Sequence, residues 1–112
     1  MKLVGRVPRA QLEDGEMVRL DWPPFHVLVT IVAGVPYAIE DACNHAGASL
    51  SEGGRLGKCV TCPMHGYIFD LTTGALIEPR GLCDDQRRYV ARFDVDHVVV
   101  YDPGPPLTIL GA

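Results

Sequence analysis

Cys43-Asn44-His45 and Cys62-Pro63-Met64-His65 stand 16 residues apart (46–61) in the middle of the chain. A thiol and an imidazole one or two residues apart can point into the same space from a tight turn. Two such turns side by side supply four ligands to one metal centre. Gly47 and Gly66 come shortly after the two histidines and allow backbone conformations that other residues resist. The pattern predicts a metal centre held between two loops.

The chain on both sides of these loops consists of short β-branched runs separated by glycine and proline, which is typical of strands and turns. Strands are expected at 2–7, 17–20, 26–32, 35–39, 58–61, 67–71, 75–77, 89–95 and 98–101. Segment 8–15 is expected to be a loop, and 41–56 to be loop-rich with at most a helical turn at 48–52. Asp96-His97 is expected to form the last turn because both residue types are enriched at positive φ. The predicted fold class is all-β.

Size and composition limit what the chain can do. Its 112 residues, 47% of them hydrophobic, fit one domain with a single core, which excludes a large multi-site enzyme. The longest apolar stretch, 27–39, is too short and interrupted to cross a bilayer, and the first residues lack the apolar segment of a secretion signal. A net charge of −4 with scattered basic residues argues against nucleic acid. We therefore expect a cytoplasmic protein that binds neither membrane nor nucleic acid.

The two loops resemble those of the Rieske [2Fe–2S] family, in which Cys-X-His is followed by Cys-X-X-His. Segment 62–74, Cys-Pro-Met-His-Gly-Tyr-Ile-Phe-Asp-Leu-Thr-Thr-Gly, is similar to that family's second ligand loop and the hairpin after it. The resemblance runs from the first strand to about Tyr101. It implies one Rieske domain over 1–112, an antiparallel β-sandwich or barrel with a cluster-binding subdomain at about 41–82 inserted as two loops. A proline-rich tail would follow at 102–112.

The resemblance also implies the ligands of one [2Fe–2S] cluster per chain. Cys43 and Cys62 would bind one iron as thiolates, and His45 and His65 would bind the other through their imidazoles. Segment 79–82 falls where the family has a proline-containing loop that shields the cluster from water, and its Pro/Gly composition suits that role.

Residues near the four candidate ligands indicate where the cluster's reduction potential would lie within the range of the family. High-potential relatives carry an additional cysteine in each ligand loop, and a serine and a tyrosine that donate hydrogen bonds to the reduced cluster. Here the first two positions hold Ala48 and Met64, and the other two hold Tyr67 and Phe69. Phe69 has no hydroxyl to donate. We therefore expect a potential at the low end of the Rieske range, which spans roughly −150 to +300 mV.

Other interpretations of the cysteines and histidines remain open at this point. Two thiolates and two imidazoles also suit structural zinc, although the spacing differs from zinc fingers. A cluster held by all four cysteines would leave both histidines unexplained. Cys59 and Cys62 form Cys-X-X-Cys, but the βαβ pattern of a thioredoxin-like motif is missing. Cys59 is expected as a buried strand residue, Cys83 as a loop thiol, and His26 and His97 as ordinary structural residues.

The function implied is that of a Rieske-type ferredoxin, an electron carrier and not itself an enzyme. It would take one electron from a flavin-dependent ferredoxin reductase and deliver it to a terminal oxygenase or similar acceptor, as a monomeric component of a multicomponent dioxygenase. One alternative is a Rieske subunit or regulatory domain of a larger oxidoreductase, such as the small subunit of assimilatory nitrite reductase. Another is a Cys2His2 zinc-stabilised interaction module.

Trp22 and Phe25 are expected to cover one end of the barrel.

Overall fold

The computed structural model describes residues 1–43 and 47–104, and within these ranges the chain forms ten strands and two short 3₁₀ helices. The larger sheet consists of β1 (Lys2–Pro8), β2 (Val18–Leu20), β3 (Val27–Val32), β4 (Val35–Glu40), β9 (Arg88–Asp94) and β10 (His97–Asp102). The smaller sheet consists of β5 (Gly54–Leu56), β6 (Cys59–Thr61), β7 (Ile68–Asp70) and β8 (Leu76–Glu78). The 3₁₀ helices are η1 (Arg9–Gly15) and η2 (Leu50–Glu52). The predicted all-β class is confirmed, and none of the described helices is long and apolar enough to span a membrane.

The larger sheet is a nearly closed barrel. Its strands run antiparallel in the order β1-β10-β9-β4-β3-β2. The two edge strands, β1 and β2, lie close together. A Cβ added to Gly5 of β1 would lie 3.3 Å from the side chain of Leu20 in β2. Closing the sheet in this way protects edge strands that would otherwise expose unpaired backbone groups.

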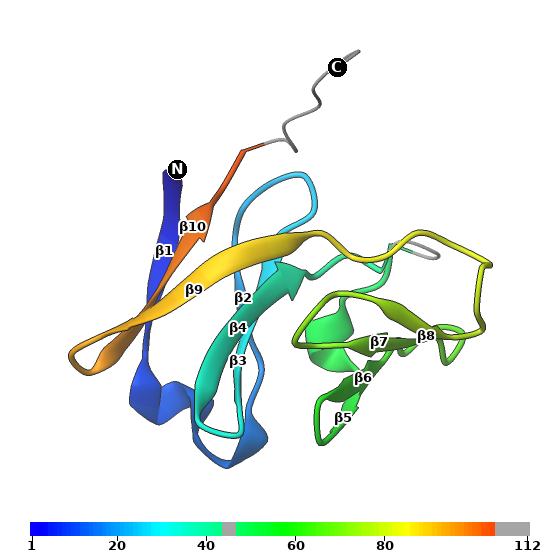
Figure 1. Ribbon diagram of the computed structural model, residues 1–112, viewed down its shortest axis with the longest axis horizontal. Coiled ribbons are helices and arrows are strands. Elements are labelled where there is room, and N and C mark those ends of the chain that lie inside the picture. The colour runs from blue at the N-terminus through cyan, green and yellow to red at the C-terminus, as the bar shows by residue number, and fades with distance from the viewer. Residues whose placement is uncertain (44–46, 105–112) are drawn as a thin grey trace.

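The smaller sheet is inserted between two strands of the barrel. The chain leaves the barrel after β4, forms β5 to β8 in sequence order, and returns at β9 (Figure 1). β4 and β9 are themselves paired, with Ala38 opposite Tyr89 and Ile39 opposite Arg88. The departing and returning segments therefore start from neighbouring strands, and the smaller sheet lies beside the barrel.

The described residues bury two hydrophobic clusters, so the expectation of a single core is wrong. Strands β3 and β4 contribute to both, because successive side chains of a strand point to opposite faces. Val27 and Val29 face the barrel interior, whereas Leu28 faces the smaller sheet. The cluster under the smaller sheet, called here the second cluster, consists of Leu28, Ile39, Cys43, Leu50, Val60, Cys62, Phe69 and Leu71.

Local structure differs from the sequence expectations in three places. In the expected loop 8–15, Pro8 ends β1 and Arg9–Gly15 form η1, whose Leu12 is buried in the barrel core. Residues 54–56, expected within a loop-rich region, form β5, which pairs with β6. In the last hairpin, Asp94 pairs with His97, so Val95 and Asp96 are the turn residues and Val95 takes the positive φ of 55°. The proline-rich tail begins at the end of β10, and its residues 105–112 lie outside the described part.

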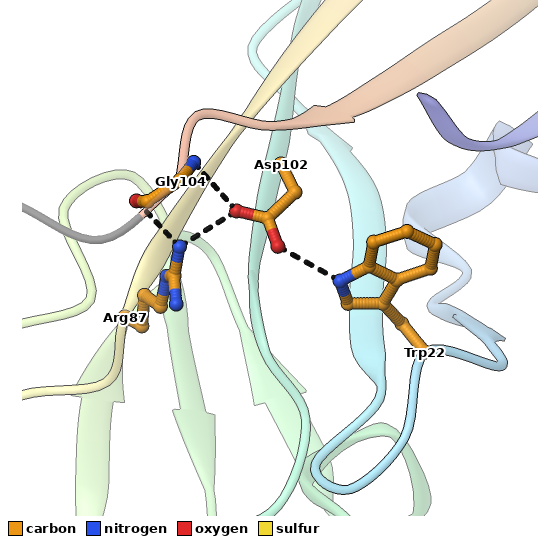
Figure 2. A network of polar contacts seen from close by, with 4 residues as sticks. All are labelled: Trp22, Arg87, Asp102 and Gly104. Carbon is orange, nitrogen blue, oxygen red and sulfur yellow. Dashed lines mark hydrogen bonds and ion pairs between the residues drawn. The ribbon is translucent and has the colours of Figure 1, made fainter. Parts of the chain in front are cut away.

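A half-buried polar network ties the end of β10 to the returning segment (Figure 2). Asp102 accepts hydrogen bonds from the indole N–H of Trp22 at 2.9 Å, the N–H of Gly104 at 2.8 Å and the guanidinium of Arg87 at 2.6 Å. Arg87 also donates to the carbonyl of Gly104 at 2.6 Å. Burial raises the pKa of Asp102, but these hydrogen bonds and the charge of Arg87 outweigh burial and hold the pKa below its ordinary value.

We expect Asp102→Asn to lower the free energy of unfolding at pH 7 by about 2 kcal/mol, because asparagine has one acceptor oxygen and no charge to offer Arg87. A carboxylate with a lowered pKa stabilises the fold above its unfolded-state pKa, about 3.9, and this contribution is lost as the pH falls through the folded-state value. Urea denaturation should therefore show the two proteins converging below about pH 4.

Asp94→Asn is the matched control. Asp94 pairs with Arg6 at 3.4 Å, but both side chains are 53% exposed, so this change should cost less than about 1 kcal/mol. Equal losses in the two variants would show that the half-buried network contributes no more to stability than a surface ion pair.

Candidate metal centre

The structure brings the two predicted cysteine ligands into one buried place. Cys43 follows β4 by a short segment and Cys62 follows β6 directly, yet both belong to the second cluster. Cys43 is 2% exposed and Cys62 is 1% exposed, whereas His65 is on the surface. His45, the fourth predicted ligand, lies outside the described residues. The two thiols therefore point inward and the described imidazole outward.

The two cysteine loops are closed by the same pair of backbone hydrogen bonds. The N–H of Cys43 donates to the carbonyl of Ala48 at 2.7 Å, and the N–H of Gly47 donates back to the carbonyl of Cys43 at 2.7 Å. In the second loop Cys62 donates to Tyr67 at 2.7 Å, and Gly66 donates to Cys62 at 3.0 Å. The bonds join the same relative positions, so the loops present their cysteines alike.

A glycine is required at one position of each loop. Gly47 has φ of 72° and Gly66 has φ of 75°, the left-handed region that residues with a Cβ rarely adopt. The sequence indicated this requirement, since both glycines follow the candidate ligands. The closing hydrogen bonds explain it physically, because each glycine donates the bond that returns the chain to its cysteine.

The segment before Cys43 is held by Asp41, a buried carboxylate. Its N–H donates to the carbonyl of His26 at 3.0 Å, its carbonyl accepts from Leu50 at 2.8 Å, and its Oδ1 accepts from the N–H of Ser51 at 2.8 Å. Among the described residues, Asp41 Oδ2 is a buried side-chain oxygen without a hydrogen bond. These contacts fix the entry of the first loop against η2.

The segment after Cys62 is held by Asp70, at the end of β7. Its Oδ1 accepts from both the N–H and the hydroxyl of Thr72, at 2.8 and 2.7 Å, and its Oδ2 pairs with Lys58 at 3.3 Å. Burial raises the pKa of Asp70, but the Thr72 hydrogen bonds and Lys58 more than offset it, so the pKa is lowered. Asp70 therefore stays ionised at neutral pH and fixes the hairpin that follows the second loop.

The predicted shielding segment 79–82 lies beside the second loop. Pro79 and Gly66 both line a surface depression of about 480 Å³, together with Ile77, Glu78 and Arg80. Beyond this segment, Asp85 accepts a hydrogen bond from the N–H of Leu76 in β8 at 2.8 Å and so holds the chain that follows it. Cys83 packs against the second cluster, and burial, followed by the charges of Asp84 and Asp85, raises the pKa of its thiol. Cys83 is thus a protonated, half-buried thiol at neutral pH.

Two surroundings of the cysteines were not apparent from the sequence. Phe25 was expected to cover the barrel, but it is 52% exposed and lines a depression together with Cys43 and Gly47. Gly53 approaches the residue before Cys62 so closely that a Cβ would lie 2.0 Å from the carbonyl oxygen of Thr61. In the sequence, the Gly53-Gly54 pair is a weak indication that two backbone segments approach closely here. Nothing in the sequence indicates that Phe25 lies exposed beside Cys43.

The types of donor side chain suit two metal chemistries. A single zinc ion needs four ligands converging on one point, whereas a [2Fe–2S] cluster of the Rieske type divides two thiolates and two imidazoles between two irons. Among residues 1–43 and 47–104 no group of three His, Cys, Asp or Glu side chains forms a candidate ion site, and His45, one of the four predicted donors, lies outside these ranges. Buried thiols with an imidazole toward solvent fit the divided arrangement.

Comparisons with known proteins agree with this chemistry. The model of the Rieske [2Fe-2S] domain family matches residues 4–83. The ferredoxin subunit of 3-phenylpropionate/cinnamic acid dioxygenase from Escherichia coli (strain K12) is 40% identical over 75 residues, 66% of this chain and 70% of that protein. The ferredoxin of carbazole 1,9a-dioxygenase from Nocardioides aromaticivorans IC177 superposes with a TM-score of 0.77 at 27% identity, covering 89% of this chain and 97% of that one.

A further solved structure contains a complex. It is described as reduced oxygenase with oxidized ferredoxin in carbazole 1,9a-dioxygenase, and it matches with a TM-score of 0.76 at 27% identity, covering 85% of this chain and 97% of that one. The superposed fold is the barrel with its inserted smaller sheet.

We expect Gly53→Ala to destabilise the protein by about 1 to 3 kcal/mol, because the new methyl group must displace the backbone of Thr61, next to Cys62. Gly54→Ala is the same chemical change one residue later, where no atom lies within 4 Å of the added Cβ. It should change the free energy of unfolding by less than about 0.5 kcal/mol. Thermal or urea denaturation measures both, and similar values for the two variants would contradict the close approach.

Proposed function

The chain belongs to the Rieske [2Fe–2S] domain family, and we propose that it is a ferredoxin that carries one electron at a time. The observation that carries the proposal is that Cys43 and Cys62 are buried while His65 is exposed. The two cysteines lie on loops that are closed by backbone hydrogen bonds between equivalent positions. The dioxygenase ferredoxin subunit that is 40% identical supports the same role. The whole of 1–112 would be one Rieske domain, with a cluster-binding subdomain at about 41–82.

We propose Cys43, His45, Cys62 and His65 as ligands of one [2Fe–2S] cluster per chain. The cluster would supply reversible one-electron chemistry. The chain holds the thiols of Cys43 and Cys62 away from water in the second cluster, and it leaves His65 at the surface. Surface exposure of an imidazole ligand would give electrons a short route between the metal centre and a docked protein.

The surface around His65 suits brief protein contacts. Pro63 and Met64 beside it are exposed, and Leu82 of the shielding segment is 64% exposed. Pro63 and Met64, with Ala48 of the first loop, would form a small apolar patch beside His65. Ala46, which the sequence also assigns to this patch, lies outside the described residues. A small patch favours rapid release, and we propose that the protein is a monomer that meets its partners transiently.

The partners we propose are a flavin-dependent ferredoxin reductase as donor and a terminal oxygenase or similar protein as acceptor. The solved complex of a related ferredoxin with its oxygenase supports the acceptor. The protein would act in the cytoplasm as a component of a multicomponent dioxygenase, without catalysing the oxygenation itself. An oxygenase would need a 2-His-1-carboxylate iron site, and the two remaining histidines, His26 and His97, lie on separate segments.

The test is visible and low-temperature EPR spectroscopy of anaerobically purified protein, before and after dithionite, with iron, sulfide and zinc assayed on the same sample. We expect about two irons per chain and a reduced signal of low average g. His65→Ala should abolish that signal, because it removes an iron ligand. His97→Ala, on the distant β9–β10 hairpin, is the control and should leave the signal unchanged.

Two outcomes would favour the alternatives. A colourless protein that holds zinc would indicate a structural zinc module and no electron transfer. Recovery with a large partner at equal stoichiometry would indicate a permanent subunit of a larger oxidoreductase.

We expect the midpoint potential to lie below about +100 mV. Phe69, which takes the position of a hydroxyl donor in high-potential relatives, is fully buried in the second cluster and has no hydroxyl to stabilise added negative charge. Spectroelectrochemical titration of the purified protein measures the potential. A value above that limit would contradict the predicted position at the low end of the Rieske range.

A further inference from the structure

Gln86 is a buried polar residue that joins the barrel to both ligand loops. It is 2% exposed and lies at the end of the segment that returns to β9. Its side-chain Nε2 donates two hydrogen bonds, to the carbonyl of Glu40 at 2.9 Å and to the carbonyl of Ala42 at 2.7 Å. Both acceptors belong to the segment that leaves the barrel toward Cys43.

The bond to Ala42 reaches the first ligand loop through a single peptide unit. The carbonyl of Ala42 and the N–H of Cys43 belong to the same peptide group, and that N–H donates the 2.7 Å bond to Ala48 that closes the loop. Hydrogen bonds in such a chain polarise and strengthen one another. The Gln86 amide therefore supports the loop closure that presents Cys43.

The backbone of Gln86 is fixed to the hairpin that follows the second ligand loop. Its N–H donates to the carbonyl of Gly74 at 2.7 Å. Gly74, with φ of 81°, approaches so closely that a Cβ there would lie 2.3 Å from the carbonyl oxygen of Gln86. One residue thus contacts the hairpin after Cys62 through its backbone and the segment before Cys43 through its side chain.

We propose that Gln86 is a positioning residue that sets the first ligand loop relative to the second. It acts on Cys43 through the Ala42–Cys43 peptide, whose carbonyl accepts its hydrogen bond. The inference rests on the proposed function only in treating Cys43 as a cluster ligand. Without the amide donor, the carbonyls of Glu40 and Ala42 lose their bonds to Gln86 in a buried place, and loop closure at Cys43 weakens.

The experiment compares Gln86→Met, which keeps the length of the side chain but has no donor, with Gln86→Asn, whose amide is too short to reach both carbonyls. Gln11→Met, at an exposed position of η1, is the matched control. Hydrogen exchange of the protein as isolated is followed by mass spectrometry in peptides covering 41–50 and 60–69. We expect exchange in the first peptide to rise about tenfold in both Gln86 variants and to stay unchanged in the second peptide and in the control.

A spectroscopic reading separates positioning from a general structural role. In the reduced protein, the Gln86 variants should show shifted EPR g values, and Gln11→Met should not. Unchanged exchange, equal increases in both peptides, unshifted g values, or failure of both variants to fold would each overturn the proposal. Exchange does not require a cluster, so a protein without iron would refute the proposed function while the exchange comparison still decides the role of Gln86.

Discussion

The inserted sheet depends on the hydrogen bonding between the two chain segments that connect it to the barrel. The N–H of Glu40 donates to the carbonyl of Arg87 at 2.8 Å, and the N–H of Arg87 lies 3.3 Å from the carboxylate of Glu40. The departing and returning segments run side by side at this point (Figure 1). Because both are paired before they separate, the smaller sheet starts from a fixed place on the nearly closed barrel.

A second connection limits rotation about that attachment. Arg55 of β5 donates to the hydroxyl of Thr30 at 2.5 Å and to the carbonyl of Ile31 at 2.9 Å, both in β3. Leu28 and Ile39, from β3 and β4, pack with Phe69 of β7 in the second cluster. Hydrogen bonds at one end and apolar packing beneath therefore hold the smaller sheet and its two cysteine loops against the barrel. In the proposed electron carrier, a fixed setting of these loops would favour fast electron transfer, because little rearrangement would accompany a change of charge.

The distribution of polar groups explains how the sheet can be small and still ordered. Four strands of three residues could not bury a core alone. The barrel supplies one wall through β3 and β4, and the buried carboxylates Asp41 and Asp70 satisfy backbone donors in the loops that the short strands leave open. The expectation of one core was wrong because β3 and β4 bury side chains on both of their faces. Each face contributes to one of the two hydrophobic clusters.

The sequence by itself determined the fold class, the family and the candidate ligands, because these depend on local signals: β-branched runs, turn glycines, and Cys/His pairs at fixed spacing. It placed most strands within a residue or two, including β3, β4 and the last hairpin. It did not reveal the second cluster or the exposure of Phe25, because both depend on residues distant in sequence. It also missed β5, although the partner strand β6 follows within a few residues, because the segment Gly54-Arg55-Leu56 has no β-branched residue.

The role of Gln86 is the clearest case of what only the tertiary structure decided. A glutamine between two aspartates and two arginines is expected to be exposed, yet the return of the chain past β4 buries it against two carbonyls. No local pattern specifies those partners, since they lie 46 and 44 residues away in sequence and meet only when the barrel has closed.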